Sequence, residues 1–372
     1  ERRFGINVMQ QRDKQFDFWL PGCALALSIL GLIAIYSASR AEEANFAQKQ
    51  LLWILLGLGV GVVIALIDYR FLVRLSRPLY IFNLLLLFTV LFAGRSVMGA
   101  QRWINLGGGF RLQPSELAKL ILIITLSAYI AANKASLRTL WGLCKSWLHM
   151  AIPMLLILKQ PDLGTTLVLI AIWFGMMWVG GARARHLILI ALAGLMAFTA
   201  AWHVGFIKDY QKQRLVSFLN PEADPLDTGY HTIQSTIAIG SGGLTGKGLL
   251  RGTQSQGGFI PEQHTDFINT IIGEELGFVG SCLLLLLFYF LIYRGLQIAN
   301  ETDDIHGRLI AIGIVSMFTF HVFINLGMTL HIMPVTGVPL PFLSYGGSSM
   351  LLNMASVAIL FNIRRHREAL RF

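Results

Sequence analysis

Residues 18–38 read FWLPGCALALSILGLIAIYSA and carry no charged side chain. A run of this kind is long enough to cross the roughly 30 Å hydrocarbon core of a bilayer as one α-helix. Comparable apolar runs recur along the whole chain of 372 residues. Because only helices and closed barrels can span lipid, the recurrence predicts an all-α integral membrane protein, folded as a single polytopic membrane domain over residues 1–372.

The composition of the chain indicates the same class. Apolar residues make up 55% of the chain and charged residues only 13%, and the mean hydropathy is +0.62. Soluble domains carry about a quarter charged residues, so an ordinary soluble fold is excluded. We expect about ten transmembrane helices, at residues 18–38, 50–67, 78–94, 115–132, 146–159, 163–180, 186–206, 270–293, 308–329 and 346–363.

Basic residues cluster in alternate connecting segments, and the alternation predicts the orientation of the helices. The clusters lie at residues 2–14, 70–77, 134–145, 183–185, 294–308 and 364–371. The excess of Lys and Arg in cytoplasmic loops places these segments, and both termini, in the cytoplasm. The formal net charge of +10 therefore reflects topology and attraction to anionic membrane lipid. The basic residues are scattered over loop ends, so no nucleic-acid partner is expected.

With this orientation, the longest extracytoplasmic segment is a large loop over residues 207–269, between the seventh and eighth spans. Loops longer than about 15 residues in compact proteins are usually functional or disordered. Apolar residues such as Leu215, Phe218 and Ile233 interrupt the polar sequence, which favours an ordered cap over the membrane domain. Any function is therefore expected on the outer side of the membrane.

The stretch Gly240–Gly248 within this loop is rich in glycine and contains a Gly-Lys pair. A phosphate-binding P-loop requires Gly five residues before that pair and Ser or Thr after it, but Ser241 and Gly248 occupy those positions. We interpret the stretch first as a turn-rich surface loop and second as a nest that binds a diphosphate or an oligosaccharide.

Three acidic residues lie where polar segments meet apolar runs, and a charge at the edge of a bilayer is costly unless it is used or paired. Asp266 precedes the eighth span, so it is either a helix cap or a chemical group. Glu116 and Lys119 are three residues apart on one helix face, as an internal ion pair or as an acid that positions a phosphate-binding cation. Asp162 begins the sixth span, where a helix N-cap is an equal alternative to a role in a site.

Other polar residues lie at helix ends or inside spans. Arg102, next to Trp103, is interpreted as an interfacial anchor or as a contact to a lipid headgroup. His321 and Asn325, four residues apart on the ninth span, are expected to hydrogen-bond to neighbouring helices. The two prolines of residues 339–341 forbid a regular helix, and broken backbone at membrane depth must line a cavity or be buried in protein. This segment therefore favours an outward-facing crevice.

Several motifs occur together in one order along the chain. They are QPSE at residues 113–116, QPDLGT at 160–165, DYQKQR at 209–214, NPE at 220–222, GYHTIQS at 229–235, PEQHTDFI at 261–268 and PLPFLSYGG at 339–347. Together they cover nearly the whole chain and resemble the SEDS proteins (shape, elongation, division and sporulation). The sequence GKGLLRGTQSQ at residues 246–256 resembles the cell-elongation branch of that family. One departure is Asn269, a polar residue at a position that is often aromatic or apolar in the family.

The resemblance implies a peptidoglycan glycosyltransferase, an enzyme that polymerises lipid II into glycan strands during cell elongation. It implies a location in the bacterial cytoplasmic (inner) membrane, with the active site facing outside and undecaprenyl diphosphate as leaving group. The implied partners are a class B penicillin-binding protein, which is a transpeptidase, other proteins of the elongation machinery, and lipid II as substrate.

Glycan extension needs a base for the acceptor hydroxyl and cations for the diphosphate. We therefore predict that Asp266 is the general base, that Lys119 lies close enough to hold it ionised or to contact phosphate, and that Glu116 completes the catalytic group. The candidates for substrate binding are Arg102, Asp162, Arg214, His264 and Ser344. A divalent cation (Mg or Mn) could share the charge, but no residue spacing assigns its ligands, and no cofactor is demonstrable from the sequence.

Two other functions fit parts of the sequence. A lipid II flippase or transporter is compatible with many spans and broken helices, but its site is expected near the midplane of the membrane. The polar clusters of this chain gather instead at the outer interface. A non-catalytic scaffold for the transpeptidase is the remaining alternative, and it predicts that Asp266 can be neutralised without effect on cell shape.

Overall fold

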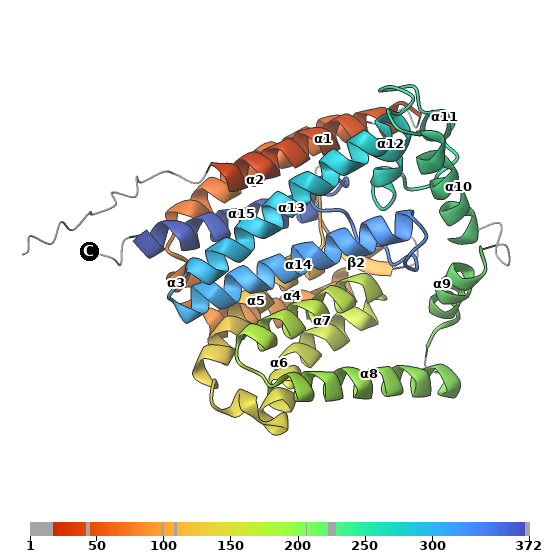
Figure 1. Ribbon diagram of the computed structural model, residues 1–372. Helices are drawn as coiled ribbons and strands as arrows, with labels where there is room; N and C mark the ends of the chain where they lie inside the picture. Colours follow the sequence, from red (N-terminus) through yellow and green to blue (C-terminus); the bar gives the residue numbers. More distant parts are fainter. Residues whose placement is uncertain are drawn as a thin grey trace, which may run out of the picture.

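The computed structural model describes residues 18–41, 45–97, 100–107, 110–205, 207–221 and 228–368, and helices dominate them (Figure 1). The described parts of the predicted apolar runs lie in helices except for a few residues at their ends: α1 (Trp19–Ala41), α2 (Phe46–Leu66), α4 (Ser76–Ala93), α5 (Pro114–Ala132), α6 (Leu140–Lys159), α7 (Leu163–Val179), α8 (Ala184–Val204), α12 (Ile268–Glu275) with α13 (Gly277–Glu301), α14 (Ile305–Thr329) and α15 (Gly347–Glu368). Seven of the described helices are long and apolar enough to cross a membrane, whereas α4 and α7 are apolar but shorter. The all-α integral membrane class is confirmed, and the number of ten spans stays a prediction.

Two short helices lie in connecting segments that the basic clusters predict to be cytoplasmic. They are α3 (Tyr69–Arg74) and the 3₁₀ helix η1 (Ser136–Arg138). Figure 1 places the start of α1 and the end of α15 at one end of the bundle, and α9 to α12 with β2 at the other. This arrangement agrees with an even number of crossings.

The eighth predicted run is not one continuous helix. It divides at Leu276 into α12 and α13, and α13 begins at Gly277, which has φ +67°. A Cβ added to Gly277 would lie 2.3 Å from the backbone nitrogen of Gly246. Only a residue without a side chain allows this approach, so the glycine-rich stretch of the preceding loop packs directly on the break.

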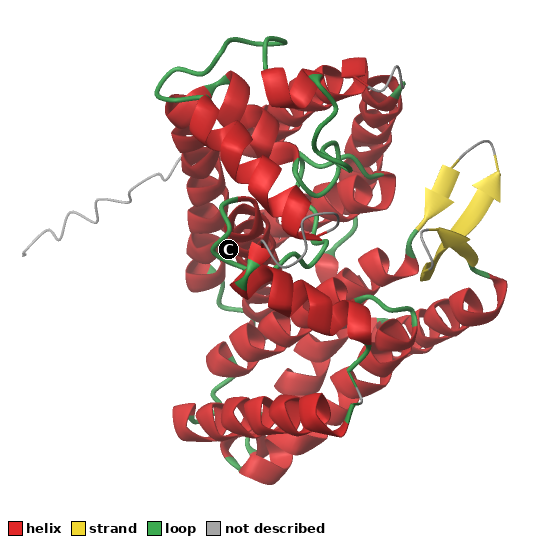
Figure 2. Cartoon of the chain, turned by 90° about the vertical axis from the view of Figure 1, so that its right-hand side faces the viewer, coloured by secondary structure: helices red, strands yellow, loops and turns green. Residues whose placement is uncertain are grey.

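The segment between α4 and α5, which lies outside the predicted spans, forms a small sheet. It forms three antiparallel strands in the order β1-β2-β3: β1 (Arg95–Val97), β2 (Ala100–Gly107) and β3 (Phe110–Leu112). Figure 2 shows this sheet at one side of the helices. The strands are short, and each is stabilised by pairing with its neighbour. The sequence therefore shows no helical or alternating pattern that would predict them.

The described part of the predicted loop 207–269 is mostly helical. It contains α9 (Asp209–Leu219), α10 (Thr228–Ser241) and α11 (Thr253–Gln256). α10 packs against α9, α11, α12 and the end of α14. The hydroxyl of Ser235 donates to the carbonyl oxygen of Thr329 at 2.7 Å. Asn269, the departure from the family pattern, is buried and donates to the Thr329 hydroxyl at 3.1 Å. The segment is therefore an ordered cap, while its extracytoplasmic location stays a prediction.

α14 lies inside the bundle and organises its centre. It packs against α5, α7 and α13, and most of its residues are buried. α8 lies apart from the bundle in Figure 1, and only 6% of its apolar stretch is buried. Such a helix leaves nearly all its sides to lipid or to another protein, whereas the polar side chains of α5 and α14 must find partners inside the fold.

Candidate active site

Asp266 lies in the loop that leads into α12, against the proline-containing segment after α14. Its backbone oxygen accepts a hydrogen bond from the side-chain amide of Asn325 at 2.9 Å, and the same amide donates to the carbonyl oxygen of Val338 at 2.8 Å. A Cβ added to Gly337 would lie 3.4 Å from Oδ2 of Asp266. The broken segment at residues 335–343 therefore forms a wall beside this carboxyl group.

The carboxyl group of Asp266 does not cap a helix. The N-cap residue of α12 is Phe267, and the start of that helix has no side-chain cap hydrogen bond among the described residues. The capping alternative for Asp266 is therefore wrong, because the side chain makes none of the bonds that a cap requires. Its oxygens stay available for chemistry at the partly exposed end of the loop.

The surroundings of Asp266 raise the pKa of its carboxyl group toward neutral pH. Burial first, and the negative charge of Glu262 second, raise the pKa of this carboxyl group from 3.8 to about 6. The positive charges of Arg214 and Arg102 oppose this increase in the pKa, and the charge of Asp162 adds to it. A general base works best with a pKa near the operating pH, so Asp266 has the basicity that the role needs. The same contributions show that Arg214 and Arg102, both predicted to bind substrate, lie within electrostatic range of Asp266.

Lys119 and Glu116 form a buried ion pair on α5. Nζ of Lys119 lies 2.7 Å from Oε1 of Glu116, and the exposed fractions of the two residues are 1% and 3%. Nζ also lies 3.1 Å from Nε2 of His321 on α14. Lys119 was predicted to hold Asp266 ionised, but the structure gives it Glu116 and His321 as its partners. Among the described residues no ion pair joins it to Asp266, because the acid three residues away on its own helix is the nearer charge.

Asp162 is the N-cap of α7, as one of the two sequence alternatives predicts. Its Oδ1 accepts from the backbone nitrogen of Thr165 at 3.1 Å, and its Oδ2 accepts from the hydroxyls of Thr165 and Ser115 at 2.9 and 3.1 Å. A guanidinium nitrogen of Arg102 lies 3.9 Å from Oδ1. Arg102 also donates to the carbonyl oxygens that precede Asp162 in the chain. The β2 strand therefore attaches to the start of α7 through Arg102.

Two other substrate-binding candidates, His264 and Ser344, are buried and contact neighbouring residues. The ring of His264 stacks on Phe46 with centroids 4.2 Å apart, and His264 is buried. The Ser344 hydroxyl accepts a hydrogen bond from the backbone nitrogen of Leu340 at 2.8 Å and is buried, so it stabilises the proline-containing turn. The substrate-binding roles of His264 and Ser344 stay predictions.

The glycine-rich stretch packs on α12 and does not form an open nest. The backbone nitrogen of Lys247 donates to the carbonyl oxygen of Glu274 at 3.0 Å. Nζ of Lys247 lies 2.7 Å from Oε1 of Glu274, whose side chain is fully buried. That carboxylate also accepts from two backbone nitrogens at the start of α11. The interpretation as a turn-rich loop is the one that the structure supports.

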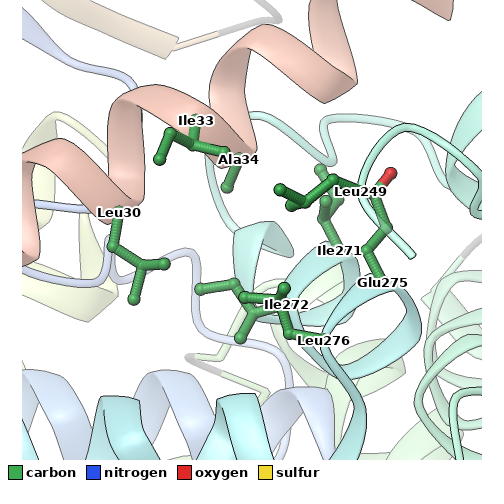
Figure 3. Close-up of a pocket in the computed structure, with 8 residues that line it drawn as sticks. All are labelled: Leu30, Ile33, Ala34, Leu249, Ile271, Ile272, Glu275 and Leu276. Atoms are coloured by element: carbon green, nitrogen blue, oxygen red, sulfur yellow. The ribbon is translucent and has the colours of Figure 1, made fainter. Parts of the chain in front are cut away.

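A small pocket lies between α1 and α12, and Figure 3 shows its lining. The carboxylate of Glu275 stands at its edge, and every other lining residue is apolar: Leu30, Ile33, Ala34, Leu249, Ile271, Ile272 and Leu276. Its lining contains no cation that could neutralise a diphosphate. In the described part of the chain, no group of three or more His, Cys, Asp or Glu side chains could hold a metal ion, and the Mg or Mn prediction stays open.

The sequence predicts His321 and Asn325 only as residues that hydrogen-bond to neighbouring helices, not as residues of the site. His321 does hydrogen-bond to a neighbouring helix, through Lys119 of α5. Asn325 instead holds two backbone oxygens, those of Asp266 and Val338. Their four-residue spacing was the available signal, but their partners lie far away in the chain.

Comparison with known proteins gives the family. A family model described as "Cell cycle protein", which covers FtsW, RodA and SpoVE, matches residues 18–369. The chain belongs to this family, the SEDS proteins. With seven apolar helices in the described residues, it is a multi-pass bacterial membrane protein.

Individual SEDS relatives match nearly end to end. The peptidoglycan glycosyltransferase MrdB of Escherichia coli is 41% identical over 348 residues, which are 93% of this chain and 92% of that protein. The peptidoglycan glycosyltransferase RodA of Treponema pallidum is 36% identical over 423 residues, with 94% and 97% covered. The stage V sporulation protein E of Bacillus subtilis is 38% identical over 362 residues, with 94% and 97% covered.

Solved structures of SEDS proteins share the fold. A chain from work on a peptidoglycan synthase complex is 34% identical, with a TM-score of 0.82, over 95% of this chain and 99% of that chain. The rod shape determining protein RodA of Thermus thermophilus is 30% identical, with a TM-score of 0.69, over 95% and 98%. The helical arrangement is therefore that of the family.

Proposed function

We propose that this protein polymerises lipid II into glycan strands during cell elongation. Its relatives MrdB and RodA are named peptidoglycan glycosyltransferases and match more than nine-tenths of the chain. The observation that carries the proposal is the Asp266 carboxyl group, which has a pKa raised to about 6 and two arginines within electrostatic range. A base, together with cations that neutralise the diphosphate, is what a single displacement at a sugar diphosphate requires.

The reaction joins the 4-hydroxyl of an acceptor sugar to the anomeric carbon of a donor sugar on a lipid diphosphate. Asp266 takes the proton of the hydroxyl while its oxygen forms the new bond to the anomeric carbon. The bond from that carbon to the diphosphate oxygen breaks, and the electron pair leaves with undecaprenyl diphosphate. One displacement inverts the anomeric centre, so one carboxylate suffices and the paired carboxylates of glycoside hydrolases are not needed.

Arg214 and Arg102 are assigned to the negative charge that develops on the leaving diphosphate. Arg214 is partly exposed on α9, and among the described residues no carboxylate pairs with it within 4.0 Å. Arg102 is bound to the start of α7 through Asp162, which holds its guanidinium in place. Lys119 is assigned to the same diphosphate from the buried side, with Glu116 orienting it. Fixed cations of this kind stabilise the transition state without reorganising during the reaction.

The membrane location and the partner belong to the same proposal. The site is assigned to the outer face of the inner membrane, with both termini in the cytoplasm, because the basic clusters predict that orientation. A class B penicillin-binding protein is the proposed partner. A structural neighbour at TM-score 0.82 comes from a peptidoglycan synthase complex, which supports such an assembly.

The test is synthesis of glycan by the purified protein from lipid II, with and without the transpeptidase. Asp266→Ala and Asp266→Asn are expected to lose polymer while remaining folded in detergent. Polymer yield from Asp266→Ala equal to that of the wild type would remove this residue from the mechanism. Movement of lipid II across vesicles without any polymer would instead support the transporter.

A further inference from the structure

Two buried residues of α14 connect the groups assigned to catalysis. His321 and Asn325 are 2% and 0% exposed, and they are four residues apart on the helix. Residues at this spacing lie on one face, about 6 Å apart along the helix axis. His321 contacts Lys119 and Asn325 contacts Asp266.

His321 accepts a hydrogen bond from the ammonium group of Lys119. An ammonium has three donors and no acceptor, so the His321 nitrogen 3.1 Å away must be the unprotonated Nε2 of a neutral ring. Glu116 accepts a second hydrogen from the same ammonium at 2.7 Å. One acceptor lies on the helix of Lys119 and the other on α14, so together they set the direction of the remaining N–H.

Asn325 uses both hydrogens of its side-chain amide to hold backbone. One goes to the oxygen of Asp266 and the other to the oxygen of Val338. These bonds attach the loop of the base and the proline-containing wall to the same helix. The position of Asp266 therefore depends on α14 as directly as that of Lys119 does.

The ammonium group of Lys119 keeps one hydrogen beyond its two recorded contacts. Two of its three hydrogens are directed to Glu116 and His321. The third is the donor that a diphosphate, which carries only acceptors at neutral pH, would require.

We propose that His321 is a positioning residue that holds Lys119 toward the lipid diphosphate, and that α14 fixes the distance between this cation and the base through His321 and Asn325. The inference rests on the proposed glycosyltransferase function. A lysine has a long flexible stem, and a fixed second acceptor restricts the ammonium to one orientation. The helix is rigid between the two residues, so substrate bound at Lys119 meets Asp266 at a constant separation.

The test compares His321→Gln with His321→Asn. Glutamine places its amide oxygen near the position of Nε2, whereas asparagine is too short to reach Lys119. His321→Asn is expected to raise the KM for lipid II roughly tenfold and also to lower kcat, because Lys119 is assigned both to the bound diphosphate and to the charge that develops on it. His321→Gln is expected to keep the KM of the wild type. Asn325→Ala is expected to lower kcat with little change in KM, because it releases the base.

Binding and a double-mutant cycle separate positioning from simple stability. The binding of lipid II is measured in an Asp266→Asn background, where His321→Asn should weaken it roughly tenfold and His321→Gln should not. In a Lys119→Gln background, His321→Asn should have no further effect on binding. Equal binding by the Gln and Asn variants, or an additive loss in the cycle, would overturn the inference. If the wild type makes no polymer, the proposed function itself fails, whereas a polymerising wild type with unaffected His321 variants refutes only the positioning role.

Discussion

The pKa of Asp266 makes the pH dependence of polymerisation a direct test of the mechanism. A general base must be deprotonated, so the rate is expected to fall as the pH decreases through about 6. With this pKa, about nine-tenths of the groups are ionised at pH 7 and slightly less than about one-tenth at pH 5, which predicts a roughly tenfold loss of rate. An aspartate with the ordinary pKa of 3.8 would remain more than about nine-tenths ionised at pH 5 and would show almost no loss.

The assay is the initial rate of glycan synthesis from lipid II, measured from pH 5 to pH 8 with the purified protein. Two neighbours provide opposite controls. Glu262→Gln removes a charge that raises the pKa of Asp266, so the acidic limb should move to lower pH. Arg214→Gln removes a charge that lowers this pKa, so the limb should move to higher pH. A rate at pH 5 equal to that at pH 7, or limbs that do not move in either variant, would refute the reasoning.

The same shift has a consequence for stability with a defined sign. A carboxyl group whose pKa is raised by folding destabilises the folded state at pH values above that pKa, and the penalty disappears as the pH falls toward 3.8. The shift corresponds to at most about 3 kcal/mol, and partial exposure of the side chain reduces it. Asp266→Asn is therefore expected to raise the Tm by a few degrees at pH 7.5, and by progressively less as the pH falls below about 6.

Three further substitutions test the packing around the site. Asp162→Ala removes the N-cap of α7 and should destabilise the fold by about 1 kcal/mol or more, seen as a lower Tm, whereas Asp162→Asn should retain most of the cap. Gly242→Ala would place a Cβ 2.0 Å from a carbonyl oxygen of α12, so little monodisperse protein is expected on size exclusion, while the control Gly240→Ala meets nothing within 4 Å. Lys247→Met leaves the buried Glu274 carboxylate without its cation and should cost about 3–5 kcal/mol; a Tm equal to that of the wild type would contradict the role of this ion pair.

Local patterns determined the helices and one of the caps. The requirement for long apolar runs is a property of each segment alone, so the predicted positions of the runs agree with the helices of the structure. Asp162 lies directly before an apolar run, and its cap needs only the residue three positions later. The Glu116–Lys119 pair was equally accessible, because three residues on a helix bring side chains together in any environment.

Such local patterns do not predict contacts between segments that are far apart in the sequence. The three strands at residues 95–112 exist only as a set, and the break at Gly277 depends on the glycine-rich stretch that packs on it. The contact between Lys119 and His321 could not be predicted either, because 202 residues separate them in the sequence. No local periodicity encodes a partner at that separation.

The apolar runs and the motifs along the chain are sufficient to identify a helical membrane protein of the SEDS family, and the position of Asp266 before the eighth run makes it the candidate base. The environment of the Asp266 carboxyl group, by contrast, exists only in the folded chain. The tertiary structure leaves the first turn of α12 uncapped by this carboxyl group, surrounds the group with protein, and brings Glu262, Arg214 and Arg102 within electrostatic range. The pKa of a carboxyl group depends on burial and on neighbouring charges, and both arise only when segments far apart in the chain pack together.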